Sequence, residues 1–447
     1  MEWPCPEPFL SCTQTLVNNT FSPCCAINFG ALVEHVIHNI PEDIRTKLIS
    51  DHPEIGNDLN TLLETLSAEE DLEKFNEFHK IPQSLERAQN IILGETTSEY
   101  FTSYTATLFK EAFINNNKQL LDKVCKACRT KEDSGVESYR QSYLKQYDVN
   151  AFQEAVANYK QVPQSIHSID VTGIVGNACN LSCNMCHPVS SSKYGAESMK
   201  LKEIPIVKAV HLPRITEEYY NDLVVNILPK AQILKVAGGE PMMSKNLFRL
   251  LERMPDKVKA NLNLQISTNL TITKNISKVL DLIRPFKQTK IHVSIEGVGL
   301  VQEYIRYPSK WHTIVENCQR LRSLPNTTVI FATTVNALNI GYNYQVVDEY
   351  SKHVDGVSFG SLVTNNFYSI RSIPPDLREI YINKLYSHYR KNPEIAHMIK
   401  MLSSVEYKEN EMWSMMAHIK RRDKYRGVNL LEVFPEWEKY YTSCTTN

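Results

Sequence analysis

The sequence of 447 residues contains no apolar run that approaches the roughly 20 residues a membrane-spanning helix needs. Its first residues show no charged segment followed by an apolar one, so we expect no signal peptide. Basic and acidic residues balance, 49 against 50, which argues against a general binder of nucleic acids or of membrane surfaces. Internal repeats and low-complexity tracts are also missing. With 42% hydrophobic and 22% charged residues, the composition is that of a soluble globular protein of two or three domains.

Cysteine is the residue type that stands out. There are 11 cysteines, an odd number, and most of them fall in clusters. A disulfide framework is a poor interpretation for a chain of this length without an export signal. Metal ligation in a reducing compartment fits better, and we therefore expect a cytoplasmic protein.

The central cluster has the spacing C-x3-C-x2-C, formed by Cys179, Cys183 and Cys186 directly after an apolar run at 169–175. Thiolates are soft ligands that suit iron–sulfur clusters or zinc. A [4Fe–4S] cluster normally takes four cysteines, so three on one loop indicate a cluster with one iron left open. A structural zinc site, the alternative, would more often show paired C-x2-C knuckles. The spacing alone leaves both interpretations open.

A second motif, Gly238-Gly239-Glu240-Pro241, ends another apolar run at 233–236. In this order, the two motifs resemble those of the radical S-adenosylmethionine (SAM) superfamily. The resemblance implies that the three cysteines hold a catalytic [4Fe–4S] cluster whose open iron binds SAM. It further implies reductive cleavage of SAM to a 5′-deoxyadenosyl radical, which abstracts hydrogen from a substrate, and an electron donor such as flavodoxin or ferredoxin.

From residue 168 onward, apolar strand-like runs alternate with amphipathic helical runs, which indicates βα units and a parallel sheet or barrel. Six strands are expected, near 169–173, 233–237, 262–267, 291–295, 329–335 and 356–359. We expect an α/β fold with three parts. These are an N-terminal helical, cysteine-bearing region (1–147), a partial (β/α)6 TIM-like barrel (148–363), which is the radical SAM fold, and a helical C-terminal extension (364–447). In the first part, the ranges 31–40 and 59–78 have helical periodicity.

Polar residues follow the predicted strands, where parallel α/β barrels form their active sites. Glu240 offers an acceptor for an ammonium group, and the planar fork of Arg306 matches a carboxylate. The resemblance assigns the loop of Glu240 to the amino group of SAM and Arg306 to its carboxylate. Glu296, where relatives have aspartate, suits a ribose diol or a substrate hydroxyl. The full set of candidate SAM contacts is Met185, Gly238, Gly239, Glu240, Pro241, Thr268, Asn269, Ser294, Glu296, Arg306, Thr334 and Val335.

A purely structural role is the alternative for several of these residues. The Gly-Gly-Glu-Pro segment can be a turn before a helix, Asn269 can cap a turn, and Met185 can fill a core. Arg306 can form a surface ion pair. The charged run 420–424 predicts a solvated helix face. Three single residues complete the expectations, with Cys318 a buried core thiol, Trp437 packed against a C-terminal helix, and Cys444 a mobile thiol near the end.

The N-terminal part contains Cys5 in a Cys-x-x-Pro-Phe segment, the pair Cys24 and Cys25, and a C-x2-C motif formed by Cys125 and Cys128. Together with a Glu-x2-Gly-x2-Ser-x-Arg segment (132–140), they resemble the N-terminal cysteine region of twitch-domain radical SAM proteins. The resemblance implies an auxiliary [4Fe–4S] cluster on Cys5, one of the paired cysteines, Cys125 and Cys128. A zinc knuckle is the alternative.

The sequence says least about the substrate. Relatives with auxiliary clusters often modify peptides, so the resemblance implies a peptide or protein substrate. Two alternatives remain, a radical SAM enzyme acting on a small metabolite, and a non-enzymatic protein in which zinc or iron–sulfur clusters only stabilise an interaction module.

Overall fold

The computed structural model describes most of the chain and divides into two compact units that interleave along the sequence. Unit 1 comprises Met1–Ile174, Lys208–Val236 and Asn246–Asn263, and unit 2 comprises Val175–Val207, Ala237–Lys245 and Leu264–Asn447. The predicted division into 1–147, 148–363 and 364–447 stays a prediction. The described residues are 2–14, 21–22, 96–133, 137–203, 215–272, 276–363, 367–388 and 392–444, with the single residues 32, 35, 42, 46, 50, 274 and 390.

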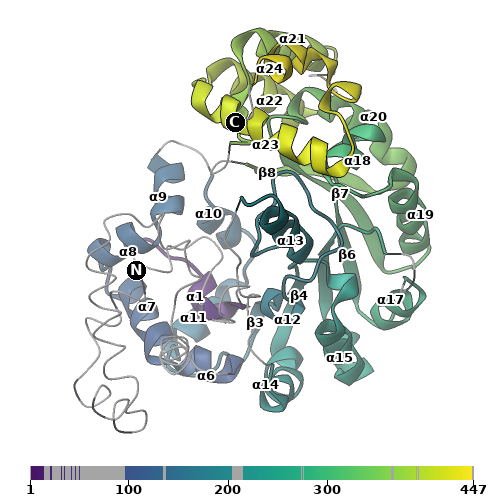
Figure 1. Ribbon diagram of the computed structural model, residues 1–447. Helices are drawn as coiled ribbons and strands as arrows, with labels where there is room; N and C mark the ends of the chain where they lie inside the picture. The colour runs from purple at the N-terminus through teal and green to yellow at the C-terminus, as the bar shows by residue number, and fades with distance from the viewer. Residues whose placement is uncertain are drawn as a thin grey trace. The chain divides into compact units, whose positions relative to one another are not determined.

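Unit 1 combines a small sheet with a group of helices (Figure 1). Its strands are neighbours in the order β2-β1-β3-β4, with β1 parallel to β3, β3 parallel to β4, and β2 antiparallel to β1. The strands are β1 (Ser11–Gln14), β2 (Phe21–Ser22), β3 (Ile166–Asp170) and β4 (Ala231–Val236). The helices include α1 (Glu7–Leu10), α6 (Thr97–Thr102), α7 (Tyr104–Ile114), α8 (Lys118–Val124), α9 (Lys126–Asp133), α10 (Tyr139–Leu144), α11 (Val149–Ala157), α14 (Glu217–Asp222), α15 (Lys245–Arg253) and α16 (Asp256–Lys259).

The N-terminal helices begin at side chains that cap them and pack around an aromatic core. Helix α6 starts with a capping box in which Thr96 and Glu99 satisfy each other's backbone N–H groups. The rings of Phe109 and Phe113 meet edge to face at 5.2 Å. Cys5 and Cys125 belong to the same buried cluster of side chains. The predicted helical ranges 31–40 and 59–78 lie outside the described residues, apart from single positions.

Unit 2 contains the strands β5 (Asn263–Thr268), β6 (Gln288–Ser294), β7 (Thr327–Val335) and β8 (Gly356–Leu362), adjacent in that order. Strands β6, β7 and β8 are parallel. Between them run α17 (Ile276–Ile283), α19 (Trp311–Arg322) and α20 (Asn343–His353), and Figure 1 shows α19 and α20 beside β7 and β8. Along β7, alternate residues such as Val329 and Phe331 are fully buried, while Ile330 and Ala332 between them are partly exposed.

All six predicted strands are confirmed within a few residues of the expected positions, and so is the α/β class with parallel strands. The apolar runs that predicted these strands are typical of strands covered by helices on both faces of a sheet. Strand β1 was missed, because Ser-Cys-Thr-Gln has no apolar pattern and its pairing with β3 depends on distant residues. Helix α14 continues as a π-helical turn at Leu223–Ile227.

The C-terminal extension is helical, as predicted, with α21 (Pro375–Tyr386), α22 (Pro393–Ser404), α23 (Glu409–Arg426) and α24 (Glu438–Ser443). Trp437 is fully buried, and its indole N–H donates to Tyr381 Oη at 2.7 Å. The expectation for Cys444 was wrong, because this residue is buried and its carbonyl accepts a hydrogen bond from the Lys420 ammonium. In the described part of the chain, no helix combines the length and the apolar character of a membrane crossing.

Candidate functional site

The three cysteines of the C-x3-C-x2-C motif lie in one loop of unit 2, ahead of helix α13 (Ser192–Lys200). N–H groups point at two of the sulfurs. Cys179 Sγ lies 3.5 Å from the backbone nitrogen of Leu181 and 3.8 Å from Asn269 Nδ2. Cys183 Sγ lies 3.7 Å from Arg306 Nη1. Such donors favour the thiolate, the form of cysteine that binds metals.

The thiols are close enough to influence one another's ionisation. Burial raises the pKa of Cys183 to about 12, against the lowering effect of Arg306, and the thiols of Cys186 and Cys179 raise it further. In the described part of the chain, no three cysteine, histidine or carboxylate side chains take up the geometry of a bound metal ion. The donor set nevertheless fits an iron–sulfur cluster, since it consists of three soft sulfurs with N–H donors facing them.

Backbone hydrogen bonds join the Gly-Gly-Glu-Pro segment to this cysteine loop. The N–H of Gly239 donates to Gly176 O, and the N–H of Glu240 donates to Ala178 O, both at 2.8 Å. A Cβ atom on Gly239 would lie 2.5 Å from Ala178 O, and Gly238 has a φ of +127°. Both positions therefore require glycine, because no other residue allows the two loops to approach this closely.

Glu240 is fully buried at the centre of a hydrogen-bond network. Its carboxylate accepts from Thr268 Oγ1 at 2.6 Å, from the Asn269 N–H at 2.7 Å and from the Met242 N–H at 3.0 Å. Burial raises the pKa of Glu240, and these three donors lower it in part. Asn269 Nδ2 also donates to Asn180 Oδ1 at 2.9 Å, so the end of β5 is joined to the cysteine loop.

Glu296 and Arg306 form a buried ion pair, whereas the structural alternative for Arg306 was an ion pair at the surface. Glu296 Oε1 accepts from Arg306 Nη2 at 2.6 Å and from Nε at 3.1 Å, and the side chains are 0% and 14% exposed. Glu296 Oε2 accepts from the Thr334 N–H at 3.1 Å and from Asn339 Nδ2 at 2.9 Å. Burial raises the pKa of Glu296 to about 7, although Arg306 lowers it.

Both oxygens of Glu296 thus accept from protein donors, and the carboxylate holds Arg306 in place with Nη1 directed at Cys183. A contact of Glu296 with a ribose or a substrate hydroxyl stays a prediction. Sequence reasoning missed Asn339, which belongs to no motif and reaches the site through the turn after β7.

Every candidate SAM contact belongs to unit 2. Thr268 and Asn269 are buried where β5 ends, Val335 is buried where β7 ends, and Ser294 ends β6 with partial exposure. Met185 is partly exposed within the cysteine loop. The roles of the individual side chains toward SAM stay predictions.

One prediction about charge was wrong. The run 420–424 is not a uniformly solvated face, because Arg422 is 1% exposed and Asp423 is 3% exposed. Asp423 accepts from Tyr304 Oη at 2.7 Å and from the Leu430 N–H at 2.8 Å. Arg421 and Lys424, on the other side of α23, are exposed as expected.

The N-terminal cysteines belong to unit 1. Cys5, Cys125 and Cys128 are buried, and burial raises the pKa of Cys5, with Glu7, Cys125 and Cys128 adding to the rise. Cys24 and Cys25 lie outside the described residues. The assignment of these cysteines to an auxiliary cluster stays a prediction.

A network of side chains connects the segments that carry these cysteines. Glu132 accepts from Arg140 Nη2 at 2.8 Å and from Trp3 Nε1 at 2.7 Å. Arg140 Nη1 donates to the carbonyl of Pro4, next to Cys5, at 2.9 Å. The Glu-x2-Gly-x2-Ser-x-Arg segment therefore ties the chain start to the region that follows Cys128.

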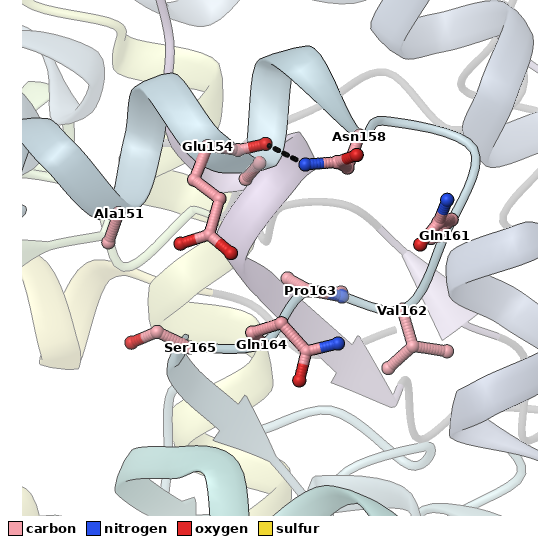
Figure 2. Close-up of a pocket in the computed structure, with 9 residues that line it drawn as sticks. Ala151, Glu154, Asn158, Gln161, Val162, Pro163, Gln164 and Ser165 are labelled. Carbon is pink, nitrogen blue, oxygen red and sulfur yellow. Dashed lines mark hydrogen bonds between the residues drawn. The ribbon is translucent and has the colours of Figure 1, made fainter.

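Unit 1 also has a pocket of about 180 Å³. Figure 2 shows it between the end of α11 and the segment 161–165, where Asn158 Nδ2 donates to the Glu154 carbonyl at 3.2 Å. It contains no cysteine and none of the candidate SAM contacts.

Residues 174–347 match the family model of the radical SAM superfamily, over somewhat less than half of the chain. No curated protein matches the sequence. Among solved structures, the chain resembles a hexahistidine-tagged anSMEcpe with bound AdoMet (16% identity, 50% of this chain and 60% of that chain, TM-score 0.35). It also resembles native anSMEcpe with bound AdoMet (13% identity, 57% of this chain and 66% of that chain, TM-score 0.34). A third similar structure is Streptococcus suis SuiB bound to precursor peptide SuiA (14% identity, 65% of this chain and 60% of that chain, TM-score 0.31).

Each alignment spans less than two thirds of the solved chain, the likeness is distant, and no conclusion about this protein rests on it. The family match covers the cysteine loop, the Gly-Gly-Glu-Pro segment and the Glu296–Arg306 pair. Residues 174–347 therefore match a radical SAM domain.

Proposed function

We propose that Cys179, Cys183 and Cys186 hold a [4Fe–4S] cluster and that the protein reductively cleaves SAM to start radical chemistry on a substrate. The observation that carries this proposal is the junction of three loops in unit 2. Backbone hydrogen bonds join the cysteine loop to the Gly-Gly-Glu-Pro segment, and Arg306 reaches Cys183. When bound, the cluster and SAM supply the electron transfer and the 5′-deoxyadenosyl radical, and the protein supplies ligands, orientation and shielding.

The residues around the cysteine loop have separable tasks in this proposal. Arg306 is held by Glu296 with one guanidinium edge beside Cys183, where it suits the carboxylate of SAM. The Gly238–Glu240 backbone runs beside the cysteine loop without side chains in the way, where it suits the amino group of SAM. The buried Glu240 network keeps these loops in register and excludes water.

The test is reduction of the anaerobically reconstituted protein in the presence of SAM. We expect 5′-deoxyadenosine to form, at a rate that depends on both reductant and SAM, and we expect SAM to change the spectrum of the reduced cluster. Liquid chromatography and electron paramagnetic resonance (EPR) spectroscopy measure the two results. A protein that binds zinc after reconstitution and forms no 5′-deoxyadenosine would be the non-enzymatic metalloprotein instead.

We further propose that unit 1 holds an auxiliary [4Fe–4S] cluster, with Cys5, Cys125 and Cys128 among its ligands. The support is that all three thiols are buried, that Cys125 and Cys128 contribute to the raised pKa of Cys5, and that Cys128 contributes to the raised pKa of Cys125. The fourth ligand would be Cys24 or Cys25. This cluster would either carry an electron from the substrate radical or stabilise the N-terminal region.

Iron analysis tests the auxiliary cluster. Reconstituted wild-type protein should bind about eight irons per chain, and a variant with both Cys125→Ser and Cys128→Ser should bind about four. Cys12→Ser is the control, since Cys12 is buried in unit 1 and lies outside the proposed ligand set. A wild-type content of about four irons that the double variant retains would contradict the auxiliary cluster and leave the catalytic one standing.

For the substrate we propose a peptide or protein. The support is the resemblance to auxiliary-cluster enzymes, many of which modify peptides. An electron donor of the flavodoxin or ferredoxin type would complete the system.

A further inference from the structure

Helix α23 presents two arginines to the cysteine loop from the C-terminal extension, beyond the residues that match the family model. The side chains of Arg422 and Arg426 are 1% and 2% exposed. They stand four residues apart and therefore share one face of the helix. Both belong to unit 2, as the cysteine loop does.

Arg426 grips the loop on both sides of Cys183. Its Nη2 donates to the carbonyl of Ser182, and its Nη1 donates to Asn184 Oδ1, each at 2.6 Å. Nε donates to Glu197 Oε1 at 2.8 Å, so the whole fork is engaged. A planar guanidinium can make these contacts at once, whereas a single ammonium cannot.

Arg422, one helical turn before Arg426, contacts the same region. Its Nη1 donates to Glu197 Oε1 at 2.9 Å and lies 3.2 Å from Ser182 Oγ. Its Nη2 donates to Ser198 Oγ at 2.6 Å and to Glu203 Oε2 at 2.8 Å. The two glutamates that accept these hydrogen bonds carry charges opposite to those of the arginines.

The opposite side of the same loop segment is fixed by backbone contacts. The N–H of Ser182 donates to Tyr307 O at 2.7 Å, and the N–H of Asn184 donates to Ile305 O at 2.8 Å. Residues 182 and 184 are therefore held from two sides, and Cys183 between them has little freedom to move. The Arg426 guanidinium also lies over the ring of Tyr307, 4.8 Å from its centroid.

We propose that Arg422 and Arg426 are positioning residues of the cluster site, which fix the cysteine loop so that its thiols are arranged to receive and retain the cluster. This inference rests on the proposed function, since it assumes a cluster on Cys179, Cys183 and Cys186. It makes the C-terminal extension an integral part of the cluster site. Partners of this kind, one step removed from the ligands, typically contribute about 10- to 100-fold to metal affinity.

Arg426→Lys is the variant that tests the proposal, because lysine keeps the charge beside Glu197 but cannot bridge Ser182 and Asn184 together. We expect the rate at which a chelator removes iron from the anaerobic protein to rise about 10- to 100-fold. The EPR signal of the reduced catalytic cluster should broaden. The matched control is Arg421→Lys, on the same helix, whose side chain is 42% exposed and pairs with Glu203 at 3.4 Å. The control should release iron at the wild-type rate.

Thermal unfolding of the metal-free proteins distinguishes the positioning role from a general loss of stability. We expect wild type and Arg426→Lys to unfold at similar temperatures. Should Arg426→Lys fail to fold, Asn184→Ala removes the loop end of the same contact and should also speed iron release. If wild-type protein holds the cluster and the variants release iron at the wild-type rate, the positioning role is overturned. Wild-type protein that binds no cluster would overturn the proposed function itself.

Discussion

Cys183→Ala should abolish the catalytic cluster and reduce SAM-dependent formation of 5′-deoxyadenosine to background. Cys183 is buried, with Arg306 Nη1 3.7 Å from its sulfur and with both neighbours, Ser182 and Asn184, fixed by hydrogen bonds. Because these contacts fix the loop, the site has little means of replacing the missing sulfur. The loss should exceed the about 10- to 100-fold that follows removal of a residue one step from a metal.

Iron analysis and the 5′-deoxyadenosine assay measure this effect, and Cys318→Ala is the matched control. Cys318 is also a buried thiol of unit 2, but it lies on the apolar stripe of α19 with Ile314 and Leu321. Its replacement should leave iron content unchanged and cost only some packing. Full 5′-deoxyadenosine formation by Cys183→Ala would show that the radical chemistry does not depend on this sulfur.

Much of the fold follows from local sequence signals. The apolar runs that predicted the strands are a property of strands covered by helices, and the motifs at their ends are contiguous in sequence. Strand β1 shows the limit of such signals, since four polar or small residues became a strand only through their pairing with β3. Pairing partners that are distant in sequence cannot be read from a local pattern.

The site shows the same limit. Sequence reasoning placed both Glu296 and Arg306 at the strand ends, Glu296 as a partner of a ribose or substrate hydroxyl and Arg306 as a partner of the SAM carboxylate. It did not predict that the two side chains form an ion pair with each other. Ten residues separate them along the chain, and the turn after β6 together with helix α18 (Leu300–Ile305) brings their side chains together. Asn339, which completes the Glu296 contacts, carries no motif at all.

Arg422 could have been predicted from the periodicity of α23. Met415 and Ile419 are buried, and the same helical spacing places Arg422 and Asp423 on the buried face. The charge run 420–424 suggested a solvated surface because charge was counted along the chain instead of around the helix. Taken by face, the arginines point toward the cysteine loop, which is the arrangement that underlies their proposed positioning role.

Glu296→Ala should destabilise the protein by about 3–5 kcal/mol, because it leaves the Arg306 guanidinium buried without its partner. It also removes the acceptor of the Thr334 N–H and of Asn339 Nδ2. Denaturant unfolding measures the change. Glu349→Ala is the control, since its pair with Lys352 is solvent-exposed and should contribute only about 0–1 kcal/mol.

A double-mutant cycle separates the ion pair from the other contacts of Glu296. Arg306→Met removes the buried charge, so the variant with both changes should be destabilised by less than the sum of the single variants. The interaction free energy should reach about 0.5–3 kcal/mol, the range for residues in direct contact. Additive effects would mean that Arg306 does not depend on Glu296, and its orientation toward Cys183 would then need another cause. Coupling of the expected sign would establish Glu296 as the group that holds Arg306 at the cysteine loop.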